Sequence, residues 1–194
     1  MADNDLRAIV GLGNPGAEYE RTRHNAGFWF VDRLAEAQRG SFRVDSKFQG
    51  LTAKVRLGDS DLLLLKPATF MNRSGQAIQA LAAFYKLAAG QILVAHDELD
   101  LPPGTARLKR GGGHGGHNGL RSVHQHLGDS YARLRIGIGH PGDKNLVLDY
   151  VLGRPSGSDQ KLIDDAIERA LAALDTLVAQ SWDKAAQQLH TEPR

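Results

Sequence analysis

Short apolar runs alternate with amphipathic stretches along most of this chain, as is typical of strands alternating with helices. Two neighbouring runs are separated by Gly58-Asp59-Ser60, which indicates a β-hairpin. The predicted strands cover residues 6–12, 52–57, 62–66, 92–95, 105–110 and 133–138. This order predicts an α/β protein.

Apolar residues at helical spacing fill several of the stretches between these strands. They predict helices over residues 28–37, 74–85 and 120–127. Ser74 is the expected N-cap of the second helix, and Gly128 is expected to end the third.

The pattern changes after residue 138. Residues 139–158 are rich in Gly and Pro, and we expect them to form a mobile connection. An apolar stripe over residues 163–177 follows, so C-terminal helices are expected over about 159–189, closing over the domain. With 194 residues, the chain is expected to fold as a single domain, 1–194.

Composition narrows the class of protein. Hydrophobic residues make up 41% and charged residues 24%, which fits a soluble globular chain, and a net charge of +2 is too small to indicate nucleic-acid binding by itself. The absence of cysteine excludes disulfides, thiolate metal ligands and a cysteine nucleophile. The acidic start, Met1-Ala2-Asp3-Asn4-Asp5, is no signal peptide, and no apolar stretch reaches the length of a membrane span. A cytoplasmic protein without a membrane partner is therefore expected.

Polar motifs stand near the ends of the predicted strands. Open α/β sheets bind ligands beyond the carboxyl ends of their strands, so these motifs predict one shared site. Their amides, histidines and acids suit proton transfer and hydrogen bonding to a polar substrate. The motifs are Gly11-Leu12-Gly13-Asn14-Pro15-Gly16, Arg23-His24-Asn25, Thr69-Phe70-Met71-Asn72, His96-Asp97-Glu98-Leu99-Asp100 and Gly113-His114-Gly115-Gly116-His117-Asn118.

The first motif matches the glycine spacing of a dinucleotide-binding loop. That loop must open directly into a helix, whereas Pro15 interrupts it here and helical spacing begins only near residue 26. A nucleotide-binding oxidoreductase is thus a weak alternative, which failure to bind a dinucleotide would exclude. A tight turn that presents the Asn14 amide to a substrate is the favoured interpretation.

His24 and Asp97 are the candidate base and its partner. A histidine near a helix N-terminus is more often structural than catalytic, but imidazole accepts protons near neutral pH. A carboxylate that holds the second ring nitrogen would fix the tautomer, and Asp97 ends its own predicted strand. No nucleophilic serine motif accompanies the pair, so water is the expected nucleophile.

The same acids allow a metal-binding interpretation. Asp97, Glu98 and Asp100 together with His114 and His117 offer oxygen and nitrogen ligands for a divalent ion. The two histidines lie in a glycine-rich loop without a local chelating spacing. A metal-dependent hydrolase of small esters therefore remains an alternative that sensitivity to a chelator would separate.

Residues 111–119 contain six glycines and lead into a helix. Such a loop lets the backbone approach a ligand closely, whereas a flexible linker would not be expected to contain two histidines and an asparagine. Lys109 and Arg107 share one face of the preceding strand, and Arg133 and Arg135 lie on a later one. This basic group would attract phosphates, although a merely solvated face explains its charge equally well.

Together the motifs resemble the bacterial peptidyl-tRNA hydrolase family over essentially the whole chain. The most specific stretches are Thr22-Arg23-His24-Asn25-Ala26-Gly27, Thr69-Phe70-Met71-Asn72 with Ser74-Gly75, His96-Asp97-Glu98-Leu99-Asp100 and residues 111–119. The resemblance implies a monomeric, single-domain α/β sandwich with a twisted mixed β-sheet flanked by helices. It also implies cleavage of the ester between peptide and tRNA, without a metal or other cofactor.

The resemblance further implies roles for individual residues. His24 matches the general base, Asp97 the acid that orients it, and Asn14 the amide that distinguishes blocked from free aminoacyl ends. The positions that match the binding of the peptide and the tRNA acceptor end are Tyr19, Phe70, Met71, Asn72, Lys109, His117, Asn118 and Arg135. A relative that binds RNA without hydrolysing it is a further alternative, which the presence of His24, Asp97, Asn14 and Asn72 disfavours.

Overall fold

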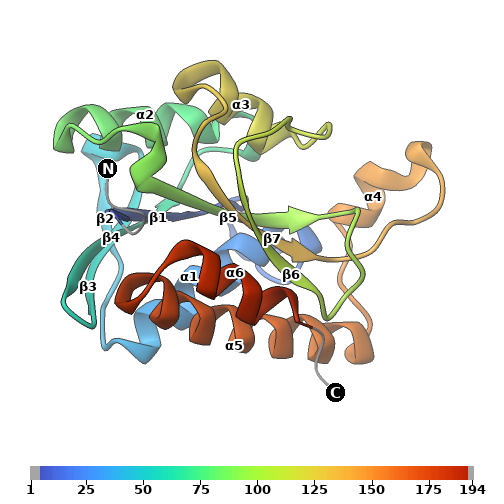
Figure 1. The fold of residues 1–194 in the computed structure, drawn as a ribbon. Coiled ribbons are helices and arrows are strands. Elements are labelled where there is room, and N and C mark those ends of the chain that lie inside the picture. The colour runs from blue at the N-terminus through green and yellow to red at the C-terminus, as the bar shows by residue number, and fades with distance from the viewer. Residues whose placement is uncertain (1–4, 192–194) are drawn as a thin grey trace.

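A seven-stranded mixed sheet forms the centre of the computed structural model, which describes residues 5–191 (Figure 1). The strand order is β2-β3-β4-β1-β5-β7-β6. The strands are β1 (Ala8–Gly11), β2 (Arg43–Asp45), β3 (Gly50–Leu57), β4 (Ser60–Pro67), β5 (Ile92–Glu98), β6 (Ala106–Arg110) and β7 (Ala132–Gly137). The predicted α/β class and mixed sheet are confirmed.

The parallel part of the sheet sets the position of the site. β1 pairs in parallel with both β4 and β5, and β5 pairs in parallel with β7. The pairs β2–β3, β3–β4 and β6–β7 are antiparallel. Four strands therefore end at the same edge, where chain segments following β1, β4, β5 and β7 come together.

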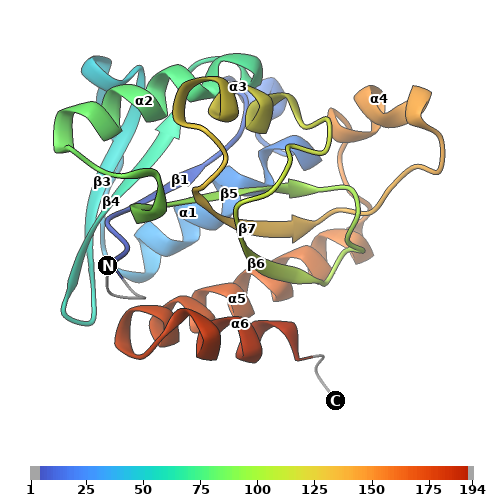
Figure 2. The same ribbon diagram turned by 45° about the horizontal axis from the view of Figure 1, so that its top comes forward.

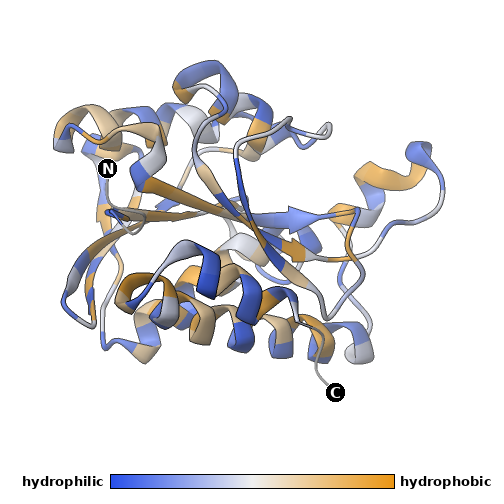
Figure 3. Cartoon of the chain, viewed as in Figure 1, coloured by the Kyte–Doolittle hydropathy of each residue, from blue (hydrophilic) through white to orange (hydrophobic). Residues whose placement is uncertain are grey.

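Helices cover both faces of this sheet (Figure 2). One face carries α2 and α3, and the other carries α1, α5 and α6. Apolar strands lie between polar outer helix faces, and α4 at the carboxyl edge is also largely apolar (Figure 3). The helices are α1 (Ala26–Ala37), α2 (Ser74–Tyr85), α3 (Asn118–Leu127), α4 (Val147–Val151), α5 (Gly157–Ala179) and α6 (Trp182–His190).

Two expectations about local structure are changed. Ser74 is not the N-cap of α2, because that position belongs to Arg73. The chain enters α2 from a 3-10 turn, Met71–Arg73, so the Ser74 hydroxyl donates to the Met71 carbonyl oxygen at 2.8 Å. The segment 139–158, expected to be a connection, contains the 3-10 turn Lys144–Leu146 and α4, and its mobility stays a prediction.

The predicted absence of a signal peptide concerns residues 1–4, which lie outside the described residues. Within the described range, no helix has the length and apolar character needed to cross a membrane.

Close backbone approach brings α1 to the carboxyl edge of the sheet. The helix begins over β1 and β5, and a Cβ atom on Gly27 would lie 2.3 Å from the Ala95 carbonyl oxygen and 2.5 Å from the Leu12 nitrogen. Both neighbours are backbone atoms in the sheet region, which cannot rotate away. Gly27 therefore lets the turn that carries His24 sit directly on the strand ends.

Gly27→Ala should destabilise the fold. The added methyl group would overlap backbone on two segments, and we expect an unfolding free energy lower by about 1–3 kcal/mol or more. Urea unfolding followed by circular dichroism would measure this loss. Gly90→Ala is the matched control, since nothing lies within 4 Å of the Cβ atom it would add. Equal stability of the two variants would contradict the assigned role of Gly27.

Candidate active site

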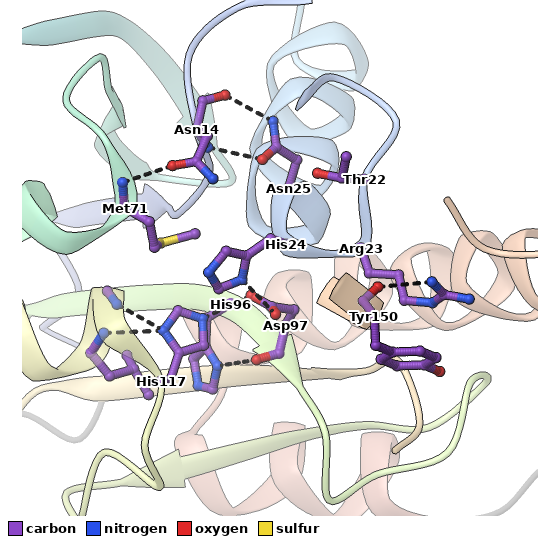
Figure 4. Close-up of polar contacts among 12 residues, drawn as sticks. Asn14, Thr22, Arg23, His24, Asn25, Met71, His96, Asp97, His117 and Tyr150 are labelled. Carbon is purple, nitrogen blue, oxygen red and sulfur yellow. Dashed lines mark hydrogen bonds and ion pairs between the residues drawn. The ribbon is translucent and has the colours of Figure 1, made fainter. Parts of the chain in front are cut away.

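Asp97 lies between two histidines at the end of β5 (Figure 4). Its Oδ2 is 2.8 Å from His24 Nδ1, and its Oδ1 is 2.8 Å from His117 Nε2. The two imidazole centroids are 4.9 Å apart. Asp97 is 3% exposed and His24 8%, so the carboxylate is removed from solvent. The contact predicted between His24 and Asp97 is present.

The backbone of α3 determines where the protons lie. His117 is the N-cap of α3, and its Nδ1 accepts hydrogen bonds from the backbone nitrogens of Gly119 and Leu120 at 3.0 and 3.2 Å. That nitrogen must be unprotonated, so Nε2 carries the proton and donates to Asp97. The other Asp97 oxygen then accepts from His24 Nδ1, which leaves His24 Nε2 with a free lone pair. A neutral His24 in this tautomer is a base with a fixed orientation.

Burial and neighbouring charge shift the pKa values of His24 and Asp97 in opposite directions. Burial alone would lower the pKa of His24, but the Asp97 charge and its hydrogen bond outweigh it, and the pKa lies above 6.5. Burial would likewise raise the pKa of Asp97, yet the two neighbouring histidines hold it well below its usual range. Asp97 therefore stays ionised and favours the protonated form of His24.

Asn14 presents one amide group beside His24 (Figure 4). Its backbone nitrogen donates to Asn25 Oδ1 at 2.9 Å, and Asn25 Nδ2 donates to its carbonyl oxygen at 3.0 Å. Its own Oδ1 accepts from the Met71 nitrogen at 2.8 Å. These bonds fix the amide orientation, so Nδ2 is the group left to donate to a ligand. The sequence motif contained Asn25, but the role of Asn25 in holding Asn14 was not predicted.

A buried arginine supports the glycine-rich loop. Arg133 was expected in a basic surface group, but it is 2% exposed, and its guanidinium makes its contacts within the protein. Its guanidinium donates to the carbonyl oxygens of Gly112 and Gly113 and lies 4.6 Å from the centroid of the Tyr131 ring. The charge thus binds loop backbone inside the protein, and a strand pattern alone gave no signal for this inward direction.

His96 is a second buried polar group that the sequence did not assign. Burial, and then the neighbouring His117, lower its pKa to about 4, so it is neutral at neutral pH. Its Nδ1 donates to the Asp97 carbonyl oxygen at 2.8 Å. His96 therefore helps to hold the backbone that positions the carboxylate.

A cavity of about 690 Å³ opens beside the His24–Asp97–His117 group. Its lining includes His24, Asp97, His117, Asn118, Lys109 and Arg135 among the predicted site residues. Arg135 Nε donates to Glu98 Oε1 at 2.8 Å, whereas Lys109 is exposed at the rim. The cavity joins a proton-accepting group to a basic rim.

The other predicted residues lie elsewhere around His24. Met71 is buried and contacts Asn14 through its backbone, while Asn72 is exposed in the same turn. Tyr19 and Phe70 meet edge to face with centroids 6.4 Å apart. Among the described residues that line the 690 Å³ cavity, these four and Asn14 do not appear. The predicted residues thus form two groups, and His24 lies between the Asn14–Met71 contact and the Asp97–His117 pair (Figure 4).

The same three side chains could hold a metal ion. Ligand atoms of His24, Asp97 and His117 lie within 4.8 Å of one another. An ion there would replace both hydrogen bonds to Asp97. His117 Nε2, which now donates to Asp97, would have to lose its proton to become a ligand. The donor set fits a divalent ion chemically, and treatment with a chelator distinguishes such a metal centre from the hydrogen-bonded group.

Comparisons with known proteins agree with the resemblance in the sequence. The family model described as "Peptidyl-tRNA hydrolase" matches residues 8–194. The chain belongs to the peptidyl-tRNA hydrolase family. It is 55% identical to a peptidyl-tRNA hydrolase of Neisseria meningitidis over 190 residues, covering 97% of this chain and 99% of the relative. It is 58% identical to one of Edwardsiella ictaluri, covering 95% of each.

A solved peptidyl-tRNA hydrolase structure has the same fold. The crystal structure from Acinetobacter baumannii superposes with a TM-score of 0.95 at 48% identity, covering 98% of this chain and 97% of that one. The predicted membership of the peptidyl-tRNA hydrolase family, an enzyme family, is thereby confirmed. The predicted sandwich with its mixed sheet is confirmed as well.

Proposed function

We propose that this chain hydrolyses the ester between tRNA and a peptide or N-blocked amino acid, releasing free tRNA for reuse. Family membership supports the reaction. The observation that carries the mechanism is the Asp97 carboxylate between two imidazoles, because it leaves His24 Nε2 as the free base. We propose that the reaction needs no metal.

In this mechanism a water molecule adds to the ester carbonyl. His24 Nε2 takes a proton from that water as the new C–O bond forms, and the Asp97 charge stabilises the imidazolium. The C–O bond to the tRNA then breaks, and the imidazolium returns its proton to the departing tRNA oxygen. Asn14 Nδ2, whose orientation is fixed, supplies an amide donor to the substrate, as for an oxyanion or a peptide carbonyl.

The two groups of residues suit the two halves of this substrate. We propose that Lys109 and Arg135 bind tRNA phosphates and that Asn118 and His117 lie near the acceptor end. Tyr19, Phe70, Met71 and Asn72 would then bind the peptide half. The enzyme is expected to act as a monomer in the cytoplasm.

Release of an N-blocked amino acid from tRNA tests this function directly. The purified chain should catalyse the release equally well with and without excess chelator. Cleavage that disappears with chelator and returns with a divalent ion would favour the metal centre at His24, Asp97 and His117. Binding of tRNA without any cleavage would favour an RNA-binding relative that has lost hydrolysis.

Lys109→Ala should weaken tRNA binding and reduce its dependence on salt. Each phosphate contact contributes to the slope of log affinity against log salt, so loss of one contact should reduce that slope by about 1. Affinity for tRNA measured at several salt concentrations would give this slope for the starting protein and for the variant. Lys54→Ala, which removes an exposed lysine from β3, is the charge-matched control. An unchanged slope in Lys109→Ala would remove this residue from the tRNA-binding surface.

A further inference from the structure

The helix α4 forms one wall of the cavity beside His24. Val147, Leu148 and Val151 line it from this helix. Leu148 is 64% exposed, so it offers apolar surface to whatever enters. The helix has only five residues and projects at the carboxyl edge of the sheet (Figure 1), so its position depends on contacts outside itself.

Arg23 supplies those contacts from the turn that carries His24. Its Nη1 donates to the Tyr150 carbonyl oxygen at 2.9 Å, and its backbone nitrogen donates to the Gly153 carbonyl oxygen at 3.0 Å. Its guanidinium carbon lies 3.8 Å from the centroid of the Tyr150 ring. A cation over a tyrosine face contributes about 0.5–2 kcal/mol, more when solvent is excluded. Two bonds and one ring contact from a single residue therefore hold the C-terminal end of α4 (Figure 4).

Tyr150 also fixes the start of the segment. Its hydroxyl donates to the Ile138 carbonyl oxygen at 2.6 Å, directly after β7. The packing leaves no spare room, because a Cβ atom on Gly153 would lie 3.1 Å from Arg23 Nη1. Both ends of the segment between Ile138 and Gly153 are thus tied to the Arg23–Tyr150 pair.

We propose that Arg23 is a positioning residue that fixes α4 as the cavity wall and so sets the affinity for the substrate part that fills this cavity. It does so from the position next to His24, within the turn Arg23–Asn25. Arg23 touches neither Asp97 nor the free nitrogen of His24, so its effect falls on binding and not on the base. This inference rests on the proposed hydrolysis for its kinetic part, whereas the attachment of α4 can be measured without substrate.

Three variants test the pair from both sides. Arg23→Gln removes the charge, Arg23→Lys keeps a cation, and Tyr150→Leu removes the ring and its hydroxyl. Arg21→Gln is the matched control, because it removes an exposed arginine two residues earlier in the chain. The measurements are kcat and KM on an N-blocked aminoacyl-tRNA, and amide hydrogen exchange over residues 144–153 in the free protein.

We expect Arg23→Gln and Tyr150→Leu each to raise KM at least fivefold with kcat within twofold of the starting enzyme. Exchange over residues 144–153 should become at least tenfold faster, while Arg23→Lys should recover part of both effects. Because Arg23 and Tyr150 act as one unit, the double variant that combines Arg23→Gln with Tyr150→Leu should raise KM no more than about twofold beyond the larger of the two single effects. The control should match the starting protein in every measurement.

Several results would overturn the proposal. Unchanged exchange in both Arg23→Gln and Tyr150→Leu would mean that the pair does not hold α4. Faster exchange with an unchanged KM would mean that the wall does not contribute to binding. A tenfold fall in kcat with a shifted pH profile would place Arg23 on the base instead. If the starting protein cleaves nothing, the proposed function fails, and the exchange data alone still decide whether Arg23 attaches α4.

Discussion

Replacing His24 with alanine is expected to lower kcat by about 10²- to 10⁴-fold, because a positioned general base contributes roughly that factor. The affinity for tRNA should change little, since the basic rim residues Lys109 and Arg135 lie on β6 and β7 and not in the turn that carries His24. Among the described residues the imidazole makes one hydrogen bond, to Asp97, and the other carboxylate oxygen keeps its bond to His117, so we expect the variant to lose the proposed base and still fold. Single-turnover release from N-blocked aminoacyl-tRNA would measure the chemical step apart from product release.

His126→Ala is the control for loss of an imidazole. This side chain donates to the Ser122 carbonyl oxygen on α3 and is absent from the described lining of the cavity. Its turnover should stay near that of the starting enzyme. If His24→Ala retained turnover within a few-fold, another group would have to be the base and the assigned mechanism would be wrong.

Asp97→Asn is expected to reduce kcat/KM by on the order of 10²- to 10⁴-fold and to move its acid limb to lower pH. An amide has one acceptor oxygen, whereas His24 and His117 each donate to this side chain, so one histidine must lose its acceptor or change its tautomer. The sign of the pH shift follows from the charges. The Asp97 charge holds the pKa of His24 above 6.5, and without it the burial that lowers this pKa remains.

The pH profile distinguishes loss of the Asp97 charge beside His24 from misfolding of the variant. In the starting enzyme, kcat/KM should rise with pH through a midpoint above 6.5, as His24 loses its proton. In Asp97→Asn the remaining activity should reach its plateau at lower pH. Asp61→Asn, which removes an exposed charge from the β3–β4 hairpin, should leave the midpoint in place. A midpoint that stays fixed in Asp97→Asn would show that another group controls the acid limb.

Much of the site could be anticipated from local sequence. His24 and Asp97 stand at ends of predicted elements on the same sheet edge, and a parallel sheet brings such ends together whatever its exact register. Roles that depend on how a side chain is packed in the folded protein could not be anticipated. Arg133 and Arg135 are two residues apart on β7 and so share one face of the strand, yet Arg133 is buried against loop carbonyl oxygens while Arg135 stays partly exposed at the cavity.

Short elements were the other source of error. The strand β2 consists of three residues, two of them exposed, so no apolar alternation marks it. The helix α4 has five residues within a segment whose glycines and prolines predicted only a connection. It contacts Arg23, more than a hundred positions away in the chain, and tertiary contacts of that kind leave no periodic signal.

Because His117 caps α3 and also donates to Asp97, both of its ring nitrogens are used in hydrogen bonds. Although two histidines flank the carboxylate, only His24 keeps a ring nitrogen that makes no hydrogen bond among the described residues. In the proposed mechanism, the proton that His24 takes from one water therefore has to pass to the departing tRNA oxygen before His24 can activate the next water.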